Sequence, residues 1–173
     1  MAKKPPENKI IKLNLQDARS SAMKLLAEAQ AKSERASVHL EKSDYAGAIQ
    51  EAVDSMERSA KGIVALVLHE WPQVHRLRPR YNVECLKELE TQLDDSQYEL
   101  FVDCAKVLLW AHTWASLHEI SQWGFDEARI ATRRLFSQWD AEAARHYADF
   151  CTTVLHRLIL VQAFRAGLAE ECK

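Results

Sequence analysis

The scarcity and placement of helix-breaking residues constrain the fold of this chain more than any other feature of its sequence. Its 173 residues contain only four glycines and four prolines, and the prolines stand at positions 5, 6, 72 and 79. Proline removes a backbone donor and clashes with the preceding helical turn, so stretches without it can form long helices. The length fits one domain. We therefore predict an all-α fold, a single up-and-down bundle of about five helices.

The predicted domain occupies residues 14–169. Residues 1–13 are expected to form a flexible leader, because adjacent prolines and lysines disfavour a helix and little there can be buried. Residues 170–173 are expected to form a short tail. The longest nearly apolar run, LILVQAF, is too short to cross a bilayer, so we expect a cytoplasmic protein without a membrane partner.

Polar residues that can cap a helix mark where the predicted helices begin. The pairs Asn14 with Asp17, and Ser137 with Asp140, have the three-residue spacing of a capping box. The other expected caps are Asn82 and either Asp94 or Asp95. Helices are predicted over residues 14 to about 39, 45 to about 67, 83–93, about 95 to 123 and 138 to about 168, with a short helix or turn over 125–136.

The second predicted helix has one apolar face and one polar face. Its apolar residues recur at spacings of three and four, the period of an amphipathic helix. They are Tyr45, Ile49, Ala52, Met56, Ala60, Ile63 and Val67. Gly62 lies inside this helix, where glycine costs about 1 kcal/mol relative to alanine, so we predict a close helix crossing there. Gly62→Leu should therefore lower Tm more than Asp54→Leu on the polar face.

The fourth predicted helix is apolar around nearly its whole circumference. One face carries Leu100, Cys104, Val107, Ala111, Trp114 and His118, and the rest carries Val102, Leu109, Trp110, Leu117 and Ile120. A helix of this kind is buried on several sides. We expect it to be the central helix or to lie in a subunit interface, and we predict a homodimer that Trp110→Glu should split.

The last predicted helix has an expected buried stripe and a polar stripe opposite. The buried stripe is Ala143, Tyr147, Phe150, Val154, Leu158 and Val161, and the polar stripe is Arg145, Asp149, Thr152 and His156. Arg145 and Asp149 are four residues apart, a spacing that favours an ion pair on a solvated face. Alternatively, the polar stripe lines a groove that a second copy completes.

Three segments together resemble the HEPN family, whose members are small helical bundles that commonly dimerise. In the run YAGAIQEAVDSMERSAKGIVALVL, Glu57-Arg58, Lys61 and Ile63-Val64 are similar to that family's Glu-Lys-x-x-Lys followed by aliphatic residues. SQWDAEAARHYADFCTTVLHRL resembles its final helix. With the first helix, the resemblance covers residues 15–165 and implies a HEPN-like bundle.

HEPN ribonucleases carry an arginine and a histidine separated by four to six residues, which act at a dimer interface. No arginine in this sequence has a histidine at that distance, and Arg35 and His39 are one residue too close. We therefore expect no catalytic residues and a binding role. If the protein is a metal-independent ribonuclease, its arginine and histidine come from unusual positions such as Arg145 and His146.

The segment after the second helix combines positive charge with aromatic rings. Phosphate contact and base stacking on single-stranded nucleic acid use this combination. The candidate nucleic-acid-binding residues are Trp71, His75, Arg76, Arg78, Arg80 and Tyr81. The alternative is a proline-braced connection whose arginines pair with the acidic helix over residues 83–93.

Charge and cysteine usage exclude several other classes. Lys and Arg number 23 against 25 Asp and Glu, so no strong overall field attracts nucleic acid or membrane. The four cysteines have no zinc-site spacing, and we expect reduced, mostly buried thiols. His118 is expected to be a core histidine. We predict no metal and no cofactor.

Three functional classes remain open. The first is a non-catalytic HEPN-like module that dimerises and binds RNA, a nucleotide or a protein. The second is the metal-independent ribonuclease. The third is a helical-repeat adaptor, because Asp44-Tyr45-x-x-Ala48-Ile49 resembles the start of a tetratricopeptide helix. That pattern occurs once, whereas a solenoid needs about three repeats, which disfavours the third class.

Overall fold

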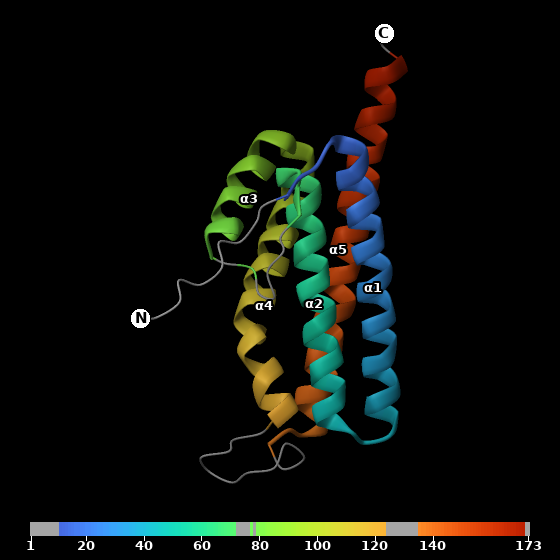
Figure 1. The fold of residues 1–173 in the computed structure, drawn as a ribbon, viewed down its shortest axis with the longest axis vertical. Coiled ribbons are helices and arrows are strands. Elements are labelled where there is room, and N and C mark those ends of the chain that lie inside the picture. Colours follow the sequence, from blue (N-terminus) through green and yellow to red (C-terminus); the bar gives the residue numbers. More distant parts are fainter. Residues whose placement is uncertain (1–10, 72–76, 78, 124–134, 172–173) are drawn as a thin grey trace, which may run out of the picture.

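A computed structural model describes residues 11–71, 77, 79–123 and 135–171, with backbone alone for 79, 119, 122, 123 and 168–171. Its elements in chain order are β1 (Ile11–Lys12), α1 (Leu15–Glu41), α2 (Tyr45–Leu68), β2 (Glu70–Trp71), α3 (Pro79–Gln92), the 3-10 helix η1 (Asp95–Gln97), α4 (Tyr98–Trp123) and α5 (Gln138–Glu171). The four long helices alternate in direction (Figure 1). The predicted all-α bundle is confirmed. The predicted short helix or turn over 125–136 lies mostly outside the described residues.

Most of the predicted caps are present at the helix starts. The Asn14 side chain accepts a hydrogen bond of 2.8 Å from the backbone N–H of Asp17. At the start of α5, the backbone N–H of Ser137 donates to Asp140 over 2.8 Å, and this bond lowers the pKa of the Asp140 carboxyl. Asp94 caps η1, which leads directly into α4.

The first turn of α2 contains Gly47, and the contacts of Asp44 at the N-cap explain why this residue is a glycine. The Asp44 carboxylate accepts from the backbone N–H of Gly47 at 3.1 Å and lies 2.7 Å from Nδ1 of His39. A Cβ on Gly47 would lie 2.3 Å from an Asp44 oxygen and 2.6 Å from that histidine nitrogen. Glycine therefore allows the cap and the histidine contact to form together.

Two predicted boundaries and one cap differ from the structure. Residues 11 and 12, assigned to the leader, pair with Trp71 and Glu70 in a two-stranded antiparallel ribbon. The 14-residue α3 begins at Pro79, because proline is well suited to a first helical turn, so Asn82 lies inside the helix and donates to the Leu108 carbonyl at 3.2 Å. At the other end, α5 continues to Glu171, into the predicted tail.

The central helix is α2, and not α4 as its apolar circumference suggested. In Figure 1, α2 lies between α1 and α4, with α5 behind it, and it contacts α1, α3, α4 and α5. Small side chains let these helices approach on several sides, and the buried ones are Ala46, Ala48, Ala52, Ser55, Ser59, Ala60, Gly62 and Ala65. The bulkier α4 lies at the side of the bundle, with Leu109 59% exposed.

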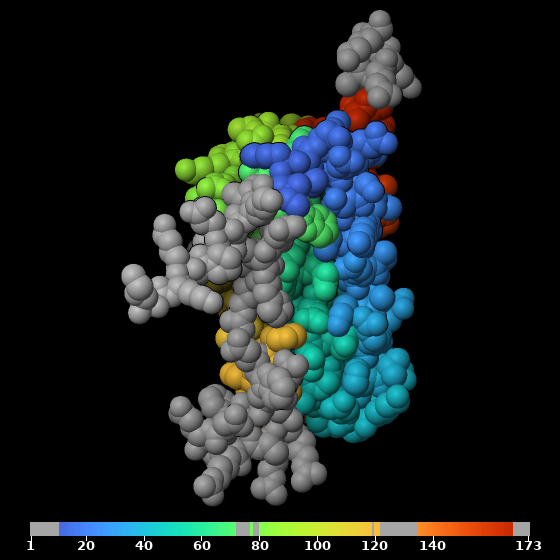
Figure 2. All heavy atoms as spheres, viewed as in Figure 1, coloured from blue at the N-terminus to red at the C-terminus, as the bar shows by residue number. Residues whose placement is uncertain are grey.

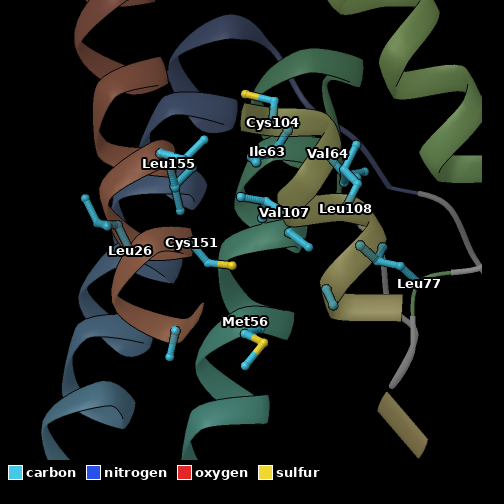
Figure 3. Close-up of a cluster of buried hydrophobic side chains, with 14 of the residues drawn as sticks. Leu26, Met56, Ile63, Val64, Leu77, Cys104, Val107, Leu108, Cys151 and Leu155 are labelled. Carbon is cyan, nitrogen blue, oxygen red and sulfur yellow. The ribbon is translucent and has the colours of Figure 1, made fainter. Parts of the chain in front are cut away.

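The close crossing predicted at Gly62 is confirmed. A Cβ at this position would lie 2.5 Å from Cδ2 and 3.0 Å from Cδ1 of Leu155 on α5. Leu155 is itself fully buried, so its methyl groups have little room to move. Figure 3 shows Leu155 and Cys151 of α5 on the side of the core opposite Val107 and Leu108 of α4.

The buried stripe of α5 is rotated from the predicted one. Ala143 is exposed, Tyr147 and Phe150 are half-buried, and Thr152, expected on the polar stripe, is buried. The buried face carries Ala141, Ala144, Ala148, Cys151, Thr152, Val154, Leu155, Leu158 and Ile159. The reason is size, because the small residues of this face allow α5 to lie close to α1 and α2, which its large aromatic residues would prevent.

Among the helices described, none has a run long and apolar enough to span a bilayer. On the face seen in Figure 2, α1 lies along the right side and packs against α2, and α3 lies at the upper left.

Candidate interaction face

The predicted nucleic-acid segment is only partly described. His75, Arg76 and Arg78 lie outside the described residues. Trp71 is half-buried in β2, opposite Ile11. Arg80 is exposed in the first turn of α3, with its guanidinium carbon 5.1 Å from the centroid of the Tyr81 ring.

Tyr81 differs most from its predicted role. Its side chain is 2% exposed and is the largest fully buried one in the described chain. The prediction that its ring stacks on a base is therefore wrong, because a base needs an open aromatic face. Helix α3 starts before Tyr81, and its rotation places the Tyr81 side chain in the core. The predicted cap at Asn82 had left Tyr81 outside the helix.

The candidate nuclease pair does not form one site within this chain. Arg145 bonds Asp149 at 2.8 Å, as its spacing predicted, and Asp149 also accepts from the Ser33 hydroxyl of α1. His146 is exposed, with its ring 6.4 Å from that of Tyr147. Consecutive residues point about 100° apart on a helix, so the Arg145 and His146 side chains diverge.

A half-buried polar network joins α1, α2 and α4. Lys32 donates to Asp54 at 2.7 Å and lies 3.1 Å from Glu51, while Nδ1 of His118 lies 3.2 Å from Asp54. Burial lowers the pKa of Lys32, but the hydrogen bonds that its ammonium group donates to the two carboxylates outweigh this effect and raise the pKa overall. Asp54 was predicted to lie on the solvent-exposed polar face of α2, but it is half-buried. The reason is that side chains of both α1 and α4 reach it.

The described side chains offer neither a reactive thiol nor a metal site. Cys85, Cys104 and Cys151 are free and buried, as predicted, and burial raises the pKa of each thiol, that of Cys104 to about 12. Cys172 lies outside the described residues. Within the described ranges, no three His, Cys, Asp or Glu residues gather closely enough to hold a metal ion.

The outward side of α5 carries an exposed row of residues that we call the outer stripe. Its two ends are strongly apolar, with Trp139 80% exposed, Leu160 55% and Phe164 70%. The outer stripe consists of Trp139, Ala143, His146, Phe150, Thr153, Arg157, Leu160 and Phe164. Sequence periodicity missed it because both sides of this helix contain apolar residues.

An aromatic cluster between α4 and α5 borders the middle of the outer stripe. The Trp110 ring lies 4.5 Å from that of Tyr147 and 5.1 Å from that of Phe150, centroid to centroid. The Trp114 ring lies 5.5 Å from Tyr147. These rings hold Phe150 at the surface, where the Lys106 ammonium lies 5.7 Å from its centroid. The border of the stripe is therefore built from rigid side chains.

No family model matches the chain, and neither a curated protein nor a solved structure matches it.

Proposed function

We propose that this chain is a non-catalytic helical module, similar to HEPN domains, that assembles with a second copy and binds a partner molecule. The outer stripe of α5 carries the proposal. Trp139 and Phe164 expose most of their surfaces at the two ends of one helix face. Large exposed aromatic residues of this kind mark protein interaction surfaces more than they mark ordinary solvated surface.

The geometry at Arg145 supports the non-catalytic part of the proposal. Its guanidinium is held by Asp149, while the neighbouring His146 points elsewhere. A general acid or base must come within hydrogen-bond reach of the atom that it serves, and these two side chains cannot converge on one phosphate within a single chain. We therefore expect no cleavage of single-stranded RNA by the purified protein.

Sedimentation velocity of the purified chain at micromolar concentration tests self-association. We expect a dimer, and a stable monomer would refute that part of the proposal. Incubation with single-stranded RNA in chelator tests catalysis. Cleavage that disappears in both Arg145→Ala and His146→Ala would instead establish the ribonuclease.

For the partner, we propose single-stranded RNA bound by Arg76, Arg78 and Arg80. Arg80 is exposed at the start of α3, as a phosphate contact requires. Replacing the three arginines by alanine should weaken RNA affinity and flatten its salt dependence, by about 0.7 in slope for each phosphate that the protein no longer neutralises. Helical content, measured by circular dichroism, should not change. RNA affinity unaffected by the triple change would move the binding site elsewhere.

A further inference from the structure

The outer stripe of α5 has the spacing of a coiled-coil seam. From Trp139 to Phe164 its eight residues are separated by four, three, four, three, four, three and four positions. That alternation is the heptad repeat, in which one row of side chains faces a partner helix along its full length. Seven of the eight residues are exposed and Phe150 is half-buried. The row touches α4 through Phe150, which packs on Trp110, and through Arg157, which bonds Asp103 at 3.2 Å.

The row is complementary to itself when it is reversed. If the second copy runs antiparallel about an axis between residues 151 and 152, every outer-stripe residue meets another. The four kinds of layer are Trp139 with Phe164, Ala143 with Leu160, His146 with Arg157, and Phe150 with Thr153. Three of the four layers place a large side chain against an apolar or smaller one. In every layer, an a position of one helix meets a d position of the other, as in antiparallel coiled coils.

Charge also favours the antiparallel orientation. Between residues 138 and 149, α5 has three acidic residues and one arginine, a net charge of −2, and between 152 and 167 it has two arginines and no acidic residue, a net charge of +2. Antiparallel pairing sets the acidic half of each copy against the basic half of the other. Parallel pairing would instead place Arg157 against Arg157, each of which also bonds Asp103 of its own chain at 3.2 Å.

The shape of the bundle agrees with this partner. The C-terminal end of α5 projects beyond the other helices (Figure 1), and Phe164, which precedes this end, is 70% exposed. In the antiparallel arrangement Phe164 lies beside Trp139 of the second copy, near the start of its α5, where Trp139 is 80% exposed. The two most exposed aromatic residues of the helix would then cover each other.

We infer that two copies of this chain pair through the outer stripes of their α5 helices, antiparallel, with the two-fold axis between residues 151 and 152. The inference rests on the proposed self-association and specifies its surface, orientation and register. Over the stripe the paired helices extend about 38 Å, at 1.5 Å for each residue.

A mixed cross-linking experiment tests the register directly. Two full-length variants, Ala143→Cys and Leu160→Cys, are made with Cys172→Ser, mixed, and oxidised in air with copper phenanthroline. In the inferred dimer, position 143 of one copy faces position 160 of the other, so a disulfide should join one variant to the other. In a dimer of two copies of the same variant, the two introduced cysteines stand about 26 Å apart along the helix axis, which is too far for a disulfide.

The outcomes of sedimentation and cross-linking distinguish self-association from the inferred surface and orientation of the dimer. A dimer in sedimentation that gives the mixed disulfide, and little of either pure one, supports the inference. A dimer that gives no mixed disulfide, or that cross-links within each variant, overturns the inferred surface or orientation and leaves self-association standing. A monomer in sedimentation refutes both claims.

A charge substitution supplies a second test that does not depend on disulfide chemistry. Phe164→Glu should raise the dimer Kd at least about tenfold with unchanged Tm of the isolated monomer, because this side chain touches little of its own chain. Leu109→Glu on α4, also exposed but away from the outer stripe, is the matched control and should leave Kd unchanged. The reverse pattern would place the interface on α4 and overturn the inference.

Discussion

Helices α2 and α4 are both rich in apolar residues, yet only α2 lies at the centre of the bundle. The described structure buries α2 beneath four other helices, whereas α4 leaves Leu109 59% exposed. The difference is one of side-chain size, because α2 has alanine, serine or glycine at many buried positions and α4 has Trp110 and Trp114. Backbones approach closely only across small residues, so size decides which of two apolar helices other helices can surround.

The strongest test of this comparison is to enlarge α2 at Gly62. Gly62→Leu should destabilise the fold by about 3 kcal/mol, because the new side chain would overlap Leu155 in a core without spare volume. For a domain of this size, Tm should fall by roughly 6–12 °C in a calorimetric scan. Asp54 is half-buried and ion-paired, so Asp54→Leu is unsuitable as the control.

Gly167 is a better control, because it lies in α5 with no atom within 4 Å of the position of an added Cβ. Gly167→Leu should leave Tm unchanged or raise it. A double variant, Gly62→Ala with Leu155→Ala, should be more stable than the sum of the two single changes predicts, since each change relieves the other. Equal effects at Gly62 and Gly167 would contradict the importance of the close crossing.

A smaller effect is expected on α4, where neighbouring residues differ in what they touch. Trp110→Ala should cost about 2 kcal/mol, because the Trp110 ring packs on Tyr147 and Phe150. Leu109→Ala next to it should stay within about 0.5 kcal/mol of the unchanged protein. Urea unfolding of the monomer measures the free energy of unfolding of both variants. Similar losses of stability would mean that the two faces of α4 are equally buried. Trp110→Glu is thus a poor test of the dimer, since it also disturbs this packing.

The smallest effect is expected at Asp54, through which α2 makes polar contacts with α1 and α4. Asp54→Asn should cost about 1 kcal/mol at neutral pH, because Lys32 loses one of two charged partners and His118 loses a carboxylate. The raised pKa of Lys32 means that this stabilisation is present below pH 10.5 and lost as pH rises above it. The difference between Asp54→Asn and the unchanged protein should therefore shrink above pH 10.5. Urea unfolding at neutral pH and above pH 10.5 measures this difference in the free energy of unfolding. A difference that stays constant with pH would mean that the loss comes from side-chain packing and not from the charge of Lys32.

Features of the candidate sites could be predicted where they depend on neighbours along one helix. The Arg145–Asp149 pair and the Asp140 cap follow from spacings of four and three residues, and the structure contains both. Tyr81 was misplaced because its role depends on where α3 begins, and the network around Asp54 was missed because its partners come from α1 and α4. Contacts between helices depend on rotations that periodicity leaves open.

By itself, the sequence determined the helical class, the starts of the long helices and the close approach at Gly62, since each follows from local preferences of a few residues for caps, helices or small size. Only the tertiary structure decided that α2 is central, that α5 turns its alanines inward, and that Trp139, Leu160 and Phe164 face outward. The physical reason is that both sides of α5 contain apolar residues, so hydrophobicity alone does not fix its rotation. Packing fixes it, because the side with the smaller residues lets the helix lie closest to its neighbours.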